Sequence, residues 1–305
     1  MPQKNMSPEV FEQALSSLEG LRHVELQGEG EPMLHPEFFR LAEIIRQRHP
    51  HARISLITNG SLLTAENVVQ LIDLAFHKVS ISIESPDPGE FSAVRGGKLE
   101  KVLDGIRLLM ASRRQRQAAR PAVGLAITIL HRTVDKFASL LDLHDELGLD
   151  GGVTYQLLQT MPVYAQHYGP EMHAEILTAD DRRKFVEELR HNPRTRDFFR
   201  QRGRPIGFYD ELFANWHPRS GECPWLSRGL YVAFDGTTTG CCFIKDTARD
   251  GFGRVTPETL PVVLAKRDAM QNELRVGRIP LPCANCPTAK AIVVEAAKRR
   301  PIKNG

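Results

Sequence analysis

The stretch that decides the fold is ISLITNGSLLTAENVVQLIDLAFHKVSISIES, residues 54–85. It opens with a short apolar strand pattern that stops at Thr58-Asn59-Gly60, a turn sequence. Thr64 then suits a helix N-cap, and apolar residues follow it at the spacing of one helical face. A second β-branched run covers residues 79–83. Two strands joined by a helix predict a right-handed parallel β-α-β unit.

The same alternation extends on both sides of this stretch. Upstream, the sequence predicts a helix that Ser7 caps and Pro8 begins, a strand over 23–27 and a helix over 36–48. Downstream it predicts a helix from Leu99, a strand over 123–130, a helix over 137–147 and a strand over 153–158. It also predicts a helix that Thr178 caps and a short helix over 287–300. Such alternation predicts an α/β fold with a parallel sheet. An open doubly wound sheet and a full or partial barrel both remain compatible with the pattern, which opens with a helix rather than a strand.

Composition and charge exclude several classes of protein. The 305 residues suffice for one large domain and a small second one. With 40 Lys and Arg against 37 Asp and Glu, the net charge of +3 indicates neither nucleic acid nor an anionic membrane as a partner. The sequence contains no apolar run of membrane-spanning length and no signal-peptide pattern. We therefore predict a cytoplasmic protein with no nucleic-acid partner and no membrane partner.

Polar residues follow three successive predicted strands. Glu31 lies in the stretch GEGEP at residues 28–32, Asn59 closes the next strand, and Ser82 and Glu84 share one face of the third. The carboxyl ends of parallel strands form the edge at which α/β proteins bind ligands. A carboxylate there can accept hydrogen bonds from a ligand ammonium group. Each residue alone suits a turn or a helix cap, but together they predict a ligand pocket.

All five cysteines follow residue 222, and the texture of the sequence changes near residue 205. Clustered cysteines in a reducing compartment predict metal binding rather than disulfides. Four thiolates suit either zinc or an iron–sulfur cluster, and their spacing leaves both open. The predicted metal ligands are Cys223, Cys241, Cys283 and Cys286. Cys241 and Cys242 are predicted to lie on the second strand of a hairpin over 229–245, so they should face opposite sides and leave Cys242 as a packing residue.

In combination, these motifs resemble the radical S-adenosylmethionine (radical SAM) enzymes that carry a C-terminal SPASM or twitch domain. Gly30-Glu31-Pro32 resembles the end of that family's Gly-Gly-Glu-Pro motif, and residues 58–60 resemble its Thr-Asn-Gly strand end. Residues 79–85, followed by Arg95-Gly96-Gly97, are similar to its fourth-strand segment. The four cysteines, with Gly236 between the first two, resemble the SPASM/twitch pattern.

The resemblance implies a partial (β/α)₆ TIM-like barrel over residues 1–205, with its first strand missing, and a cysteine-rich SPASM/twitch domain over residues 206–305. It implies S-adenosyl-L-methionine as a cofactor, with Glu31 on the cofactor ammonium and Ser82 and Glu84 near the ribose. The cofactor-binding residues that it implies are Gly30, Glu31, Pro32, Asn59, Ser82 and Glu84. It assigns one auxiliary [4Fe–4S] cluster to Cys223, Cys241, Cys283 and Cys286, and it identifies no catalytic side chain.

The implied function is that of an oxidoreductase or maturase that modifies a peptide or a small metabolite and takes electrons from a donor such as flavodoxin or ferredoxin. One departure from the family pattern stands out. The Cys-x₃-Cys-x₂-Cys loop, which holds the catalytic cluster in that family, has no counterpart here. We expect the chain to be an N-terminally truncated form of such an enzyme. The alternative is a non-catalytic binding or scaffold protein with an iron–sulfur or zinc site.

Overall fold

The computed structural model describes residues 4–28, 30–158, 160–161, 165–202, 220–244 and 246–298. The chain divides into two compact units. The smaller contains Met1–Glu19, Gln159–His173 and Glu211–Gly305, and the larger contains Gly20–Leu158 and Ala174–Asp210. The predicted domain boundary at residue 205 falls within 203–219, outside the described residues, so the domains 1–205 and 206–305 stay predictions. The first helix groups with the C-terminal segment in this division.

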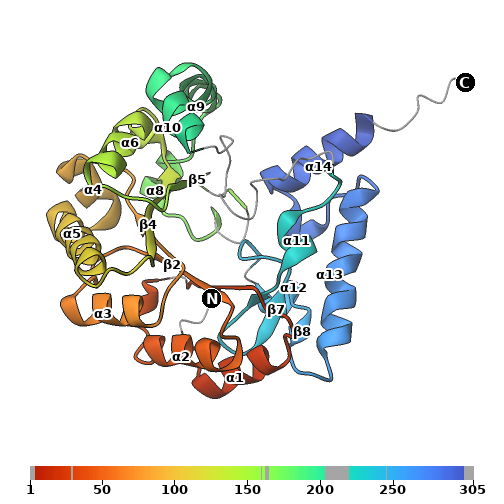
Figure 1. Cartoon of the computed structure of the whole chain (residues 1–305). Helices are drawn as coiled ribbons and strands as arrows, with labels where there is room; N and C mark the ends of the chain where they lie inside the picture. The colour runs from red at the N-terminus through yellow and green to blue at the C-terminus, as the bar shows by residue number, and fades with distance from the viewer. Residues whose placement is uncertain are drawn as a thin grey trace, which may run out of the picture. The chain divides into compact units, whose positions relative to one another are not determined.

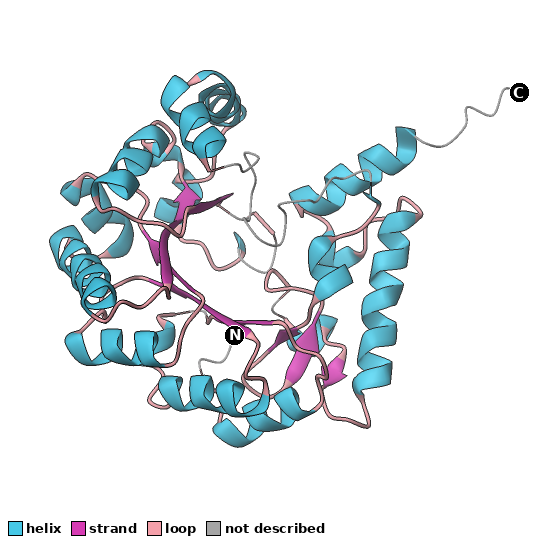
Figure 2. Ribbon diagram, viewed as in Figure 1, coloured by secondary structure: helices cyan, strands magenta, loops and turns pink. Residues whose placement is uncertain are grey.

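A five-stranded parallel sheet forms the centre of the larger unit. Its strands are β1 (His23–Leu26), β2 (Arg53–Thr58), β3 (Lys78–Ser82), β4 (Ala122–Ile129) and β5 (Val153–Leu157). They pair in sequence order, which is the order of strands in a β/α barrel. Figure 2 shows the sheet curling, with the helices of this unit on its outer side. The predicted α/β fold with a partial barrel is therefore confirmed, while the SPASM/twitch domain stays a prediction.

Helices connect successive strands of this sheet, and their ends follow the caps that the sequence predicts. They are α2 (Phe38–Arg48), α3 (Ala65–Asp73), α4 (Pro88–Arg95), α5 (Leu99–Gln115) and α6 (Phe137–Glu146), with short turns η1 (Pro32–Leu34) and η2 (His131–Thr133). The Thr64 side chain caps α3 by accepting a hydrogen bond from the backbone of Asn67. Helix α3 ends at Asp73, and Ala75 then takes a φ of +48° and turns the chain toward β3.

The last part of the larger unit is helical. The division between the two units falls in the sequence within helix α8 (Pro170–Ala174), before its last residue. Helices α9 (Ala179–His191) and α10 (Pro193–Gln201) follow it in the larger unit. As predicted, Thr178 caps α9, and Asp181 completes a capping box with it. Figure 1 shows α9 and α10 in green beside α6. Within the described residues, no helix has the length and apolar character needed to cross a membrane.

The smaller unit contains a small antiparallel sheet and several helices. The sheet has the order β6 (Tyr231–Val232), β7 (Thr237–Thr239) and β8 (Gly253–Arg254). The helices are α1 (Pro8–Ser16), α11 (Pro224–Arg228), α12 (Thr247–Asp250), α13 (Leu260–Arg275) and α14 (Pro287–Lys298), with the turn η4 (Leu281–Cys283). The sequence interpretation had omitted α13. The predicted helix at residues 287–300 corresponds to α14, of which residues 299–300 lie outside the described residues.

The predicted hairpin exists, but its second strand lies earlier in the chain than predicted, at Thr237–Thr239. Strand β7 ends at Thr239, so Cys241 and Cys242 lie in the turn after it and not on the strand. The Thr239 hydroxyl donates a hydrogen bond to the Cys241 carbonyl (3.1 Å), and the Ile244 N–H donates to the same oxygen (3.0 Å). These bonds close a turn on Cys241 in place of a strand ladder. The prediction that Cys241 and Cys242 face opposite sides of a strand is therefore wrong, because neither residue lies on a strand.

Candidate cofactor site and cysteine cluster

The end of β2 holds the side chain of Glu31 in place. Glu31 Oε1 accepts hydrogen bonds from Thr58 Oγ1 (2.8 Å) and from the Met33 N–H (3.2 Å). Glu31 Oε2 accepts one from the Asn59 N–H (2.7 Å). A carboxylate offers about four acceptor positions, and donors among the described residues take three of them on this half-buried side chain, which leaves one. The arrangement fits a ligand ammonium group, which needs such an acceptor.

Local hydrogen bonds fix the turn at residues 58–60, which presents the Asn59 N–H to Glu31. The Gly60 N–H donates to Thr58 Oγ1 (3.0 Å), and the Ser61 N–H donates to Asn59 Oδ1 (2.8 Å). Gly60 has a φ of +77°, and a Cβ atom there would lie 2.7 Å from a methyl carbon of Val102. Only glycine therefore fits at residue 60 without displacing α5. The Asn59 amide nitrogen keeps no hydrogen-bond partner among the described residues, which leaves it available to a ligand.

The end of β3 contributes an ion pair and a hydroxyl. Glu84 is 1% exposed, and the Arg95 guanidinium binds both of its oxygens, with Nε at 2.7 Å from Oε2. This bidentate pairing compensates a buried carboxylate that would otherwise be costly. The Ser82 hydroxyl makes no hydrogen bond with any other described residue. At this strand end the Ser82 hydroxyl therefore has no partner among the described residues. Glu84 can contact a ligand only while it stays paired with Arg95.

The structure brings some of the predicted residues together and separates others. Glu31 and Asn59 share one hydrogen-bond network, and Pro32 begins η1 directly after Glu31. Gly30 precedes them, and no atom lies within 4 Å of the Cβ position there. The site prediction omitted Arg95, although the Arg-Gly-Gly stretch at residues 95–97 carried the signal. Whether this group of residues binds the cofactor stays a prediction.

The four predicted metal ligands gather in the hydrophobic core of the smaller unit. Cys223 and Cys283 are buried in a cluster with Leu226, Ile244, Phe252, Val263, Met270, Leu274, Ala289 and Ile292. Cys241 and Cys286 are partly buried and pack against this cluster. None of the five cysteines forms a disulfide. Cysteines that are far apart in the sequence thus pack at one core, and their binding of a metal stays a prediction.

Burial and the neighbouring thiols both disfavour ionisation of Cys223, Cys241 and Cys283. The pKa of Cys223 is raised to about 11, mainly by burial and also by the nearby Cys286 thiol. Burial also raises the pKa of Cys241 and of Cys283, and the other cluster thiols add to both shifts. The four sulfurs are therefore within electrostatic reach of one another. Thiolates form here only if a cation compensates them.

Backbone N–H groups surround two of the sulfurs and favour their ionised form. The N–H groups of Trp225 and Leu226 hydrogen-bond the Cys223 sulfur and lower its pKa against the effect of burial. The N–H groups of Phe243 and Ile244 do the same for Cys241. Donors to sulfur also tune iron–sulfur clusters. Cys242 lies outside the cluster. The pKa of Tyr231 is raised mainly by burial and to a smaller extent by Cys242.

Four thiols can bind either a single metal ion or a polynuclear cluster. Within the described ranges, no three His, Cys, Asp or Glu side chains are placed to share one metal ion. Thiolates bound to one zinc at about 2.3 Å lie about 4 Å apart. A [4Fe–4S] cluster separates its four ligands more widely, because each thiolate binds a different iron. Both the zinc site and the iron–sulfur cluster therefore stay predictions.

The larger unit offers no ligand for a second, catalytic cluster. All five cysteines of the sequence lie between residues 223 and 286, in the smaller unit. Catalytic [4Fe–4S] clusters need cysteine thiolates. The residues of this chain therefore do not fit that cluster, and no reaction step through it follows from the structure.

Comparison with known proteins gives the family context of this geometry. Residues 1–143 match the model of the radical SAM superfamily. The chain carries a radical SAM domain. A probable GTP 3′,8-cyclase of Methanococcus aeolicus is 29% identical over 167 residues, which cover 52% of this chain and 51% of the relative. The chain spans about half the length of the curated relatives it matches.

Solved structures of similar fold cover most of this chain. Native anSMEcpe with bound AdoMet and the Cp18Cys peptide superposes with a TM-score of 0.66 at 17% identity, covering 96% of this chain and 90% of that chain. Streptococcus suis SuiB bound to the precursor peptide SuiA superposes with a TM-score of 0.57 at 13% identity, covering 79% of this chain and 54% of that chain. At such identities the likeness shows the fold alone.

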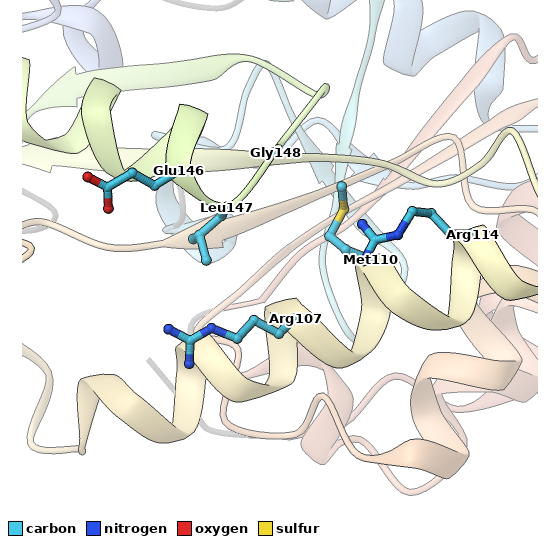
Figure 3. A pocket seen from close by; sticks show the side chains of 6 residues that line it. All are labelled: Arg107, Met110, Arg114, Glu146, Leu147 and Gly148. Atoms are coloured by element: carbon cyan, nitrogen blue, oxygen red, sulfur yellow. The ribbon is translucent and has the colours of Figure 1, made fainter.

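A separate cavity of about 350 Å³ lies elsewhere in the radical SAM domain, between α5 and the end of α6 (Figure 3). Its lining residues are Arg107, Met110, Arg114, Glu146, Leu147 and Gly148. Helix α6 ends just before the amino end of β5, so this cavity lies toward the amino ends of the strands. Ligands of parallel sheets bind at the opposite edge. We therefore assign the cavity no part in the candidate site.

Proposed function

We propose that this chain is the S-adenosylmethionine-binding and auxiliary-cluster part of a radical SAM enzyme that modifies a peptide. The observation that carries the proposal is the fixed Glu31 carboxylate, which keeps one free acceptor position at the carboxyl ends of β1 and β2. The peptides bound by two solved proteins of similar fold favour a peptide over a small metabolite as substrate. The nucleotide named for the curated cyclases is the competing substrate class.

Each side chain has a distinct role in this proposal. Glu31 accepts a hydrogen bond from the cofactor ammonium, and Asn59 lines the pocket with its free amide nitrogen. Ser82 donates its hydroxyl to the ribose, and Glu84 approaches the same sugar while Arg95 neutralises its charge. When bound, S-adenosylmethionine supplies radical hydrogen abstraction, which no protein side chain can perform alone. The chain's own residues orient the cofactor.

The cysteines belong to the second part of the proposal. Cys223, Cys241, Cys283 and Cys286 bind one auxiliary [4Fe–4S] cluster, and Cys242 takes no part. Because burial holds Cys223, Cys241 and Cys283 protonated, cluster binding releases protons and stabilises the core around the four sulfurs. An electron donor such as flavodoxin or ferredoxin would exchange electrons with such a cluster.

Adjacent cysteines provide a matched test of the cluster. We expect Cys241→Ala to lose iron and sulfide after anaerobic reconstitution, while Cys242→Ala keeps both. Cys283→Ala should behave like Cys241→Ala and also lower the stability of residues 223–286. Equal iron contents in the Cys241 and Cys242 variants would contradict the assignment. Bound zinc without inorganic sulfide would replace the cluster by a zinc site.

Binding of the cofactor is tested independently of the cysteines. Isothermal titration calorimetry with S-adenosylmethionine should give saturable binding to the full chain and to Cys241→Ala alike, because the two sites use different residues. Absence of binding would contradict the proposed function.

The second candidate function is a non-catalytic binding or scaffold protein. The observation that favours it is the absence of cysteine before residue 223. An in-frame Cys-x₃-Cys-x₂-Cys sequence upstream of Met1 in the gene would exclude the scaffold and support the enzyme. Both candidates predict cofactor binding, so the coding sequence, and not calorimetry, decides between them.

A further inference from the structure

A histidine and a buried aspartate meet at the end of β4. His131 begins η2, two residues after β4 ends, and therefore lies at the same edge of the sheet as Glu31, Asn59 and Ser82. Its Nδ1 is 2.8 Å from Oδ2 of Asp181, at the start of α9. The Asp181 side chain is 5% exposed and that of His131 is 53% exposed. The site described above does not use this pair.

Backbone hydrogen bonds hold the chain around His131 in place, separately from the side-chain contact with Asp181. The His131 N–H donates to the Glu175 carbonyl (3.0 Å), and the Arg132 N–H donates to Glu175 Oε2 (3.1 Å). The Arg132 side chain pairs with the other oxygen of the same carboxylate. The loop after β4 is thus pinned to the segment before α9, which holds the imidazole at the sheet edge.

The environment of Asp181 decides which imidazole nitrogen carries the proton. The Thr178 hydroxyl (2.6 Å), the Thr178 N–H (2.9 Å) and His131 Nδ1 all contact Oδ2. The bond from the Thr178 hydroxyl, then that from His131 and then that from the Thr178 N–H lower the pKa of Asp181, so this carboxylate stays ionised and can only accept. His131 therefore donates from Nδ1. Its Nε2 is left as an acceptor and has no hydrogen-bond partner among the described residues.

We propose that His131 and Asp181 form a proton-accepting pair at the edge of the cofactor pocket. His131 Nε2 accepts a proton or a hydrogen bond from an O–H or N–H group of the molecule bound there, and Asp181 positions the ring. When Nε2 takes a proton, the bond to the donor atom breaks, the donor keeps the electron pair, and the imidazolium is stabilised by the Asp181 carboxylate. This inference rests on the proposed function, because it requires a ligand at this edge.

The first experiment reads the tautomer directly and needs no ligand. Long-range ¹H–¹⁵N correlation spectra of the histidine-labelled full chain should show the Nδ1–H form at His131. The His131→Gln variant assigns the signal, because its spectrum lacks it. Asp181→Ala should lose that signature, whereas Asp180→Ala, beside it on an exposed ion pair with Lys184, should keep it. A wild-type Nε2–H tautomer would overturn the pair.

The second experiment places the ligand. Diethyl pyrocarbonate acylates unprotonated imidazole nitrogens, and mass spectrometry follows His131 beside the exposed His191 of α9. At S-adenosylmethionine concentrations about ten times the dissociation constant, roughly one-tenth of the protein is free, so acylation of His131 should slow about tenfold. His191 should react at an unchanged rate.

The outcomes of the second experiment separate the two proposals. Calorimetric binding without protection of His131 overturns the role of His131 and leaves the proposed function intact. No binding of S-adenosylmethionine overturns the proposed function and the His131 role with it.

Discussion

Replacing Glu31 by Gln tests how the candidate site is held together. The three donors around the carboxylate, from Thr58, Asn59 and Met33, lie 2.7–3.2 Å from its oxygens. Gln keeps the shape, but it removes the charge and places an N–H₂ group against one of these donors. Hydrogen bonds to charged groups contribute about 1.5–3 kcal/mol, and leaving a buried donor unpaired costs about 1–3 kcal/mol. We expect the local opening free energy of the 58–60 turn to fall by about 2 kcal/mol, within that range.

Hydrogen exchange provides the assay, because it reports the Asn59 amide itself. A loss of about 2 kcal/mol corresponds to about 30-fold faster exchange at this amide when exchange follows local opening. Glu37→Gln is the matched control, because Glu37 is exposed and its side chain makes no cap hydrogen bond with α2. The same Glu31 variant should weaken S-adenosylmethionine binding. Unchanged Asn59 exchange in Glu31→Gln would refute the network, whatever the effect on binding.

Three further predictions concern the larger unit. Gly60→Ala should destabilise it by more than about 1 kcal/mol in chemical denaturation, because the added methyl meets a valine carbon at 2.7 Å and the φ of +77° disfavours alanine; equal midpoints would contradict this. Arg95→Ala should cost roughly 2–4 kcal/mol by leaving Glu84 buried without its partner, and Arg95→Ala with Glu84→Gln should recover part of the loss. Burial lowers the pKa of His144 below 6.5, so the unfolded chain binds this proton first and stability should fall as the pH drops below 6.5; His144→Phe should flatten that part of the pH profile.

Local sequence signals were enough for most of the fold. The caps at Ser7, Thr64 and Thr178 act as predicted, because each depends on hydrogen bonds within one turn of the chain. The apolar runs gave the five parallel strands, because a strand covered on both faces needs nearly continuous apolar residues. The second hairpin strand was predicted at the wrong place: it forms at Thr237–Thr239, before Cys241, because the pairing of β7 with β6 and β8 sets its position and local residue types do not report that pairing.

The candidate site divides in the same way. Sequence reasoning identified Glu31, Asn59 and Ser82 because each ends a predicted strand, and strand ends of one parallel sheet share an edge. It did not pair Arg95 with Glu84, which lies eleven residues away and meets it only after α4 folds back. It also gave no sign that His131 meets Asp181, fifty residues later.

The sequence by itself therefore determined the order of strands and helices, the residues at the sheet edge and the set of four clustered cysteines. Only the tertiary structure decided which of these side chains bind one another, which acceptor positions they leave open, and that the four thiols pack at one hydrophobic core. The physical reason is range. Caps and periodicity arise from bonds within a few residues, whereas the contacts of Glu31, Glu84 and His131 depend on strand register and helix packing across the whole unit.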